Sequence, residues 1–460
     1  MSLLALLLTE LTAELALFAA VGFLIFALDD LAVDLIYFLR RGWRSAIVYS
    51  RFPPMSVERL PSPMRPGWMA VLIPAWDEAR VIAPMLRSTL DRFGTGDCRL
   101  FVGHYRNDPA TAAAIASVSD LRVVAVDIGV DGPTTKADCL NRLYAALVAH
   151  EAESGRPAKA IVLHDAEDLV HPLELTLFDR LVEYAGLVQL PVVPLIDPDS
   201  RWVAGHYADE FAEAHMKELV VREAVGASIP LAGVGCAIER VALSRLAARH
   251  DGRPFAGASM TEDYEMGLRL GAIGVKTMFV RIPAEPGSRA VVATRGHFPA
   301  TLGAAVRQKA RWIGGIAFAG WDQLGWRGGL GERWMRMRDR RGPLAALLLL
   351  SGYGSAILWA EVALAASLGA PIAVPVSPLL AMLMFINGWL LGWRILMRVG
   401  FTTAAYGVGE GLRSIPRMVV ANLIAMLAAR RALLIHSAGG PKQWDKTDHK
   451  FPTETETSRP

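Results

Sequence analysis

The chain has 460 residues and a mass of 49.9 kDa, enough for about three domains of roughly 150 residues each. Hydrophobic residues make up 53% and charged residues 20%, against about 25% charged in a typical soluble domain, and the mean hydropathy is +0.31. This composition excludes a disordered or fibrous chain and argues against a wholly soluble one, while a net charge of +3 argues against a nucleic-acid-binding protein. The cysteines have no metal-binding spacing and suit a reducing compartment; they are Cys98, Cys139 and Cys236.

The first predicted element is an apolar helix near the N-terminus. Residues 15–28 carry no charge, and the apolar character resumes beyond the acidic pair at 29–30 as far as Leu39. Since a span needs about 20 apolar residues, this stretch with its continuation predicts a transmembrane helix, followed by a linker to residue 65. A cleavable signal peptide is disfavoured because no positive residue precedes the apolar stretch.

Between residues 66 and 300, short β-branched runs alternate with helix-like segments, which predicts βαβ units and a mostly parallel α/β sheet. Ligands bind outside the carboxyl ends of such strands, so the residues that follow them matter most. No glycine-rich phosphate loop follows a strand, which argues against a dinucleotide fold or a P-loop NTPase. The predicted strands are 69–74, 99–105, 121–127, 159–165, 185–193 and 275–281.

An acidic motif, DAED, follows the predicted strand at 159–165. Asp165 and Glu167 lie two residues apart and can point to one side of the extended chain. Two carboxylates at one point suit a hard divalent cation. Acids also favour the start of a following helix, so on this motif alone both interpretations stay open.

Two further motifs follow along the chain. A TED motif at residues 261–263 opens a helix-like run, and capping of that helix is its plainer explanation. A QxxRW motif then combines arginine and tryptophan, which can bind phosphate oxygens and stack on a sugar face. A basic segment that touches anionic lipid would explain the second motif equally well.

The C-terminal third becomes strongly apolar again. Residues 344–360 and 374–393 are charge-free, arginines flank the pair, and the loop between them carries no charge. By length and the positive-inside rule, this predicts a transmembrane hairpin with both outer flanks in the cytoplasm. A last apolar stretch, 418–429, is too short to cross and predicts an amphipathic interface helix, with a buried helix of the soluble domain as the alternative.

The order of these motifs resembles that of membrane-bound family-2 glycosyltransferases, the family of the cellulose and hyaluronan synthases. A strand ending in IPAWDEA, a KAxxLN, DAED, TED and QxxRW occur in order, with one span before them and a hairpin after. The segments GHYRNDPAT, HDAEDLVHP, TRGHFP and WDKTDHKFP are similar to the bacterial phage-adsorption protein B subgroup, an inner-membrane component of exopolysaccharide assembly. The resemblance implies a GT-A type, Rossmann-like α/β domain in the cytoplasm, plus about three transmembrane helices and the interface helix.

The resemblance also implies roles for individual residues. Asp165 and Glu167, helped by Asp168, would bind Mg²⁺ or Mn²⁺ beside the sugar-nucleotide diphosphate, and Glu167 departs from the usual second aspartate. Asp263 would be the general base, next to Glu262, and residues 231–236 would form the acceptor loop. The acceptor end and the departing diphosphate would be held by Gln308, Arg311 and Trp312. Further donor-site residues would be Pro74, Asp77, Glu78, Asp108 and Lys136.

These motifs predict an inverting glycosyltransferase that moves a sugar from a nucleotide-diphosphate sugar, preferably a UDP-sugar, to a growing exopolysaccharide at the bacterial inner membrane. The alternatives are single-sugar transfer to a lipid phosphate carrier and a non-catalytic scaffold; a transporter fits worst. Expected partners are the donor, a polysaccharide or lipid-linked acceptor, the membrane and an export or outer-membrane partner, but no nucleic acid. The predicted domains are the N-terminal helix and linker (1–65), the cytoplasmic domain (66–300), the QxxRW interface segment (301–342), the hairpin (343–399) and the interface helix with a cytoplasmic tail (400–460).

Overall fold

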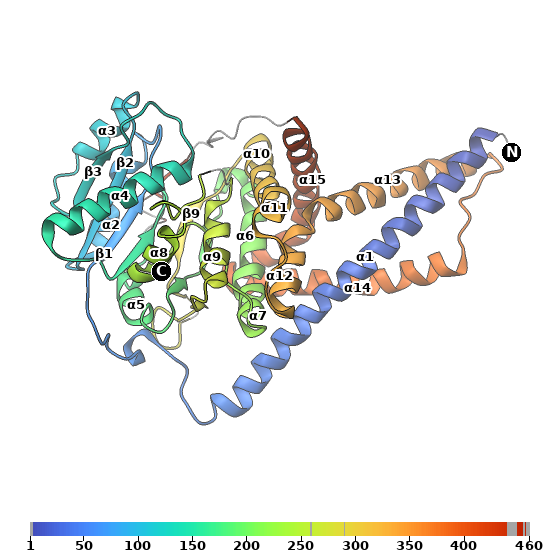
Figure 1. Cartoon of the computed structure of the whole chain (residues 1–460). Coiled ribbons are helices and arrows are strands. Elements are labelled where there is room, and N and C mark those ends of the chain that lie inside the picture. The colour runs from blue at the N-terminus through green and yellow to red at the C-terminus, as the bar shows by residue number, and fades with distance from the viewer. Residues whose placement is uncertain (1–2, 258–259, 289, 439–448, 454–455, 457–460) are drawn as a thin grey trace.

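The computed structural model describes residues 3–257, 260–288, 290–438, 449–453 and 456. It consists of an α/β body from which a bundle of long helices projects (Figure 1). The body is built on a seven-stranded sheet of order β3-β2-β1-β4-β7-β5-β8, and β6 and β9 form a second sheet. The strands are β1 Met69–Ile73, β2 Cys98–His104, β3 Val123–Asp127, β4 Ala160–Leu163, β5 Leu187–Gln189, β6 Val192–Leu195, β7 Cys236–Glu239, β8 Thr277–Phe279 and β9 Thr294–His297.

The interior strand β1 shows the pattern of a parallel sheet that is covered on both faces. All five of its residues are apolar and buried, as expected where helices cover both faces of a parallel sheet. Met69, Val71 and Ile73 contribute to the core on the side of α2 and α5, whereas Ala70 and Leu72 contribute to the core on the side of α4 and α8. β1, β2, β3 and β4 pair in parallel, and only β7 runs antiparallel to its neighbours. The predicted α/β architecture is confirmed.

Several helices of the body begin at side chains that cap them. Asp108 caps α3, Thr135 caps α4 and Thr301 caps α10, each accepting a backbone N–H of the first turn. The helices of the body are α2 Ile82–Phe93, α3 Pro109–Ala116, α4 Lys136–Ser154, α5 Glu174–Leu181, α6 Val203–Glu213, α7 Leu219–Ala224, α8 Arg240–Ala247, α9 Glu262–Ala272, α10 Leu302–Ile313, α11 Gly320–Leu324 and α12 Leu330–Arg340.

The strand predictions need two corrections. The run at 185–193 is two strands rather than one, because β5 ends at Gln189 and β6 pairs with β9 in the second sheet. Two strands were not predicted, β7 and β9, since both are four residues long and carry polar or small residues that give little β signal. Cys236, predicted to end the acceptor loop, is the first residue of β7.

Four helices are long and apolar enough to cross a membrane, by length and composition. Three of them, α1, α13 and α14, correspond to the predicted spans and form the projecting bundle, with α14 beginning four residues after the predicted start at residue 374 (Figure 1). Their bounds, with those of the fourth, are α1 Leu3–Trp43, α13 Gly342–Ser367, α14 Pro378–Tyr406 and α15 Val408–Ala438.

Helix α15 corrects the expectation for the last apolar stretch. Residues 418–429 are only its middle, because the arginines that flank them are good helix formers and extend the helix to 31 residues. Arg417, which immediately precedes that stretch, is fully buried and pairs with Asp209 of α6 and with Glu410, each at 2.9 Å. α15 packs against α6 and α10 of the body as well as α14, and it stands beside α10 in Figure 1. It therefore joins the body to the bundle.

A second junction is a charged cluster on α1. Asp29 and Asp30, which interrupt the first apolar stretch, lie 2.7 and 2.6 Å from the guanidinium of Arg341 at the end of α12. One turn further on, Asp34 lies 2.5 Å from the buried ammonium of Lys217. Pairing of this kind keeps charged side chains stable away from water, so the acids fasten α1 to the body where the helix leaves the bundle.

Candidate active site

A cavity opens at the carboxyl ends of β1 and β4, where parallel α/β sheets bind ligands. Residues from widely separated motifs line it together, including the TED motif, QxxRW and the C-terminal tail. The predicted site residues among them are Pro74, Glu78, Lys136, Asp165, Glu167, Asp168, Glu262, Asp263, Gln308, Arg311 and Trp312.

Lys136 connects two of the acidic motifs. It stands in the first turn of α4, with its Nζ 2.5 Å from Asp165 Oδ1 and 3.9 Å from Glu262 Oε1. Burial opposes its charge, but these carboxylates and that of Asp263 raise the pKa of Lys136 above its usual value. The side chain therefore stays a cation. The last residue of the same KAxxLN motif, Asn141, has a structural role, because its amide exchanges hydrogen bonds of 2.8 and 3.0 Å with the backbone of Phe255.

The first turn of α9 places two carboxyl groups in the cavity, Glu262, which is buried, and Asp263, which is half-buried. Burial raises the pKa of both Glu262 and Asp263, while Lys136 and Arg311 oppose the shift. Asp263 Oδ1 accepts the N–H of Tyr264 at 2.7 Å. Its other oxygen lies against Gly233 of the predicted acceptor loop, which has φ +81° and so favours glycine. The loop and the proposed base therefore pack directly on each other.

The turn after β4 uses Asp168 internally. Its Oδ2 accepts the N–H of Asp165 at 2.9 Å and lies 3.0 Å from Nδ1 of His164, whose Nε2 lies 2.6 Å from Glu174 Oε1. Burial disfavours the charged imidazole, but Glu174 and Asp168 raise the pKa of His164 to about 10. One oxygen of Asp168 is thus committed to shaping the turn.

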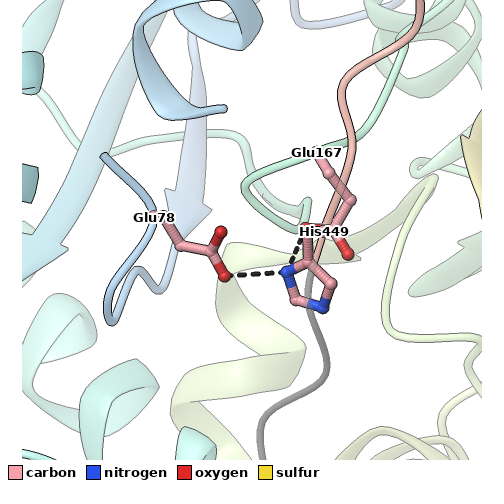
Figure 2. A group of neighbouring side chains, drawn as sticks. All are labelled: Glu78, Glu167 and His449. Carbon is pink, nitrogen blue, oxygen red and sulfur yellow. Dashed lines mark hydrogen bonds and ion pairs between the residues drawn. The ribbon is translucent and has the colours of Figure 1, made fainter. Parts of the chain in front are cut away.

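Glu167 faces a different pair of groups (Figure 2). Its Oε2 lies 3.2 Å from Nδ1 of His449, which in turn lies 2.7 Å from Glu78 Oε1. Burial raises the pKa of Glu167, although His449 opposes the shift. One ligand atom from each of these three residues lies within 4.8 Å of the others, a set of donors that suits a divalent cation. The structure does not gather Asp165 and Asp168 into this group.

The QxxRW motif lies on α10 and lines another part of the cavity wall. Trp312 packs beside the rings of Tyr207 and Phe211, with ring centroids 6.1 and 6.4 Å apart. Gln308 Oε1 is buried and has no hydrogen-bond partner among the described residues, so it is available to a ligand. Arg311 is near enough to Glu262 and Asp263 to oppose the rise that burial causes in their pKa values.

Two predicted donor-site residues do not line the cavity. Asp108 accepts the N–H of Asp77 at 2.6 Å and that of Thr111 in α3 at 3.2 Å. Asp77 itself has φ +54°, and its neighbour Glu78 donates its N–H to Thr111 Oγ1 at 2.9 Å. Asp77 and Asp108 therefore hold the turn that carries Pro74 and Glu78.

His449 is the cavity residue whose role the sequence did not reveal. It lies within WDKTDHKFP, of which residues 444–448 lie outside the described part of the chain. His297, in TRGHFP, also lines the cavity without having been assigned a role. A lone histidine in a polar segment carries no spacing signal, because its carboxylate neighbours come from positions far away in the sequence.

Comparison with known proteins identifies a family for this chain and similar relatives. Residues 66–315 match the family model described as glycosyltransferase like family 2. The chain is 36% identical over 476 aligned residues to bacteriophage adsorption protein B of Escherichia coli (strain K12) and to bacteriophage N4 adsorption protein B of Escherichia coli O157:H7. The alignments cover 97% of this chain and 63% of each relative, so the chain spans less than two thirds of their length. Among solved structures, the mannosyltransferase PcManGT from Pyrobaculum calidifontis, in complex with GDP-Man and Mn²⁺, is similar at 16% identity and a TM-score of 0.49, covering 85% of this chain and 97% of that chain.

Proposed function

The chain belongs to glycosyltransferase family 2, and on that premise we propose that it transfers a sugar from a nucleoside-diphosphate sugar to an acceptor hydroxyl at a membrane. One observation carries the proposal: a single cavity holds cations that can bind a diphosphate and a half-buried carboxylate that can accept a proton. The cations are Lys136 and Arg311, and the carboxylate is Asp263.

The reaction is a single displacement. The acceptor oxygen forms a bond to the anomeric carbon while the bond from that carbon to the diphosphate breaks, and the diphosphate leaves with the electron pair. Asp263 takes the proton of the acceptor hydroxyl, and attack from the face opposite the diphosphate inverts the anomeric configuration. Lys136 and Arg311 stabilise the negative charge that builds up on the leaving group.

A divalent cation fits the donor side of this cavity. Glu167, together with the neighbouring donors of Figure 2, would hold it, and when bound it would neutralise charge on the diphosphate. Asp165 lies beside the same site but is paired with Lys136. Its contribution would be to orient the ammonium group of Lys136.

We propose a growing exopolysaccharide as the acceptor and the bacterial inner membrane as the location, with the body in the cytoplasm. Support comes from the aromatic rings around Trp312, which suit a sugar ring. Further support comes from the apolar helices that follow the QxxRW helix in the chain. The names of the curated relatives, which connect them with phage adsorption, fit an enzyme of a cell-surface polymer. The predicted domain boundaries, with the cytoplasmic domain at 66–300 and the QxxRW interface segment at 301–342, belong to the same proposal.

The test uses the purified full chain in detergent with a panel of UDP- and GDP-sugars and Mn²⁺. Released nucleoside diphosphate reports transfer, and the length of the product separates polymer synthesis from transfer of a single sugar to a lipid phosphate. Asp263→Asn should abolish transfer while nucleotide binding stays near that of the wild type. Asp322→Asn, at an exposed position of α11, is the matched control and should keep full activity. Loss of nucleotide binding in Asp263→Asn would refute the base, and no release from any sugar would favour a scaffold.

A further inference from the structure

We propose that the C-terminal tail completes the cation site, with His449 supplying an imidazole nitrogen as a ligand beside Glu167 and Glu78 (Figure 2). The inference deepens the proposed function and rests on it, because transfer from a nucleoside-diphosphate sugar is the reason to expect a cation in this cavity. It assigns a ligand that lies 282 positions beyond Glu167 in the chain (449 minus 167).

The distances match those between neighbouring ligands of one cation. Ligands about 2.1 Å from an octahedral cation lie about 3 Å from one another. Nδ1 of His449 lies 2.7 Å from Glu78 Oε1 and 3.2 Å from Glu167 Oε2, which spans that value. Side-chain exposure is 5% for Glu78, 13% for Glu167 and 21% for His449, so the ligand atoms are shielded but can still be reached from the cavity.

The other acids of the DAED turn are engaged elsewhere. Asp165 pairs with Lys136 at 2.5 Å, and Asp168 is bonded to His164 and to the backbone of the turn. Glu167 is therefore the acid of this turn that lies beside the candidate metal ligands Glu78 and His449. A glutamate at this position reaches one methylene further than the usual aspartate, which suits a ligand set assembled with Glu78 and the tail.

The residues that follow His449 attach the tail to the body, so the imidazole does not reach the cavity by chance. Phe451 packs against the core formed by α2, α5 and the sheet, and Pro452 is buried. Lys450 Nζ lies 3.4 Å from Asp197, and Glu456 lies 3.4 Å from Nε2 of His297 in the cavity wall. Residues 449–453 are thus attached to the body, with His449 in the cavity lining.

A nitrogen ligand has a consequence for the choice of metal. Mg²⁺ prefers an all-oxygen shell and keeps several waters, whereas imidazole suits Mn²⁺ and later transition metals better. The proposed site should therefore bind Mn²⁺ more tightly than Mg²⁺, and the difference should depend on His449. Loss of a residue that only orients a ligand weakens metal binding by about 10–100-fold, so loss of a direct ligand should cost at least about tenfold.

The experiment measures metal binding without turnover. Electron paramagnetic resonance of the full chain in detergent, titrated with MnCl₂ alone, gives the Mn²⁺ affinity, and pulsed measurements detect hyperfine coupling from an imidazole nitrogen. We expect that coupling in the wild type and in the control His250→Asn, which changes an exposed histidine. In His449→Asn it should disappear and Mn²⁺ affinity should fall at least about tenfold. Unchanged coupling in His449→Asn would overturn the inference.

A second variant keeps the test decisive if the first perturbs the tail. His449→Asp restores a ligand, now an oxygen, so it should bind a cation again with the preference shifted from Mn²⁺ toward Mg²⁺. Binding of neither cation by His449→Asp would overturn the ligand assignment. Nucleoside diphosphate release measured in parallel separates the two proposals: nitrogen coupling without transfer refutes only the proposed function, and transfer without nitrogen coupling refutes only the role of His449.

Discussion

Replacing Gly233 with alanine should disable the proposed base without changing it. An added Cβ at this position would lie 2.7 Å from Oδ2 of Asp263 and 3.4 Å from its Cβ and Cγ. A carbon and an oxygen do not approach so closely, so the carboxylate must rotate or the loop must lift. Either movement separates the proton acceptor from the place where the acceptor hydroxyl would bind.

Two costs can be separated for Gly233→Ala. The left-handed backbone costs alanine about 1–2 kcal/mol wherever it occurs. A misplacement of about 1 Å at a reacting group lowers the rate by about a hundredfold. Gly226→Ala is the matched control, because Gly226 has φ +73° and nothing within 4 Å of an added Cβ. It should lose a similar amount of stability and no catalytic rate.

The assay is the initial rate of nucleoside diphosphate release, with nucleotide affinity and melting temperature measured on the same preparations. We expect Gly233→Ala to release nucleoside diphosphate about a hundred times more slowly than Gly226→Ala, with a nucleotide affinity close to that of the wild type. Equal rates in the two variants would show that the contact with Asp263 does not position the base.

Three further predictions test other parts of the structure. Burial opposes ionisation of Glu183, but Lys159 and the N–H groups of Met64 and Arg65 lower the pKa of Glu183 to about 2 in the folded protein. The unfolded pKa is about 4.3. The ionised carboxylate therefore stabilises the fold above about pH 4.3, and this stabilisation is lost as the pH falls toward 2. Glu183→Gln should therefore melt at a lower temperature than the wild type at pH 7, by the equivalent of about 1 kcal/mol, and the gap should narrow in melts toward pH 3; a constant gap would contradict this. Arg417→Met leaves Asp209 buried without its partner and should cost about 3–5 kcal/mol in thermal unfolding, much of it recovered when Asp209→Asn is added. EDTA should stop nucleoside diphosphate release and Mn²⁺ should restore it, whereas turnover undiminished by EDTA would argue against a cation.

Local sequence patterns predicted most of the fold. The apolar run of β1 predicts a strand covered on both faces, and the acids that follow β4 mark the end of the sheet where the cavity opens. These signals depend only on neighbouring residues, so they can be interpreted without the rest of the chain. The predictions were wrong where neighbours are a poor guide, as in β7, a short strand stabilised by pairing with β4 and β5, and in α15, whose Arg417 belongs to a buried ion pair.

By itself, the sequence determined the α/β class, the apolar helices and the list of residues able to do chemistry, because each of these follows from local composition and spacing. Only the tertiary structure decided which of those residues meet. It pairs Asp165 with Lys136, turns Asp168 toward His164 and brings His449 to Glu167. Such contacts depend on how distant segments pack, and no periodicity in the chain encodes a distance between them. The acidic motif therefore offered candidate ligands for a cation, while the fold placed Glu167 beside Glu78 and His449.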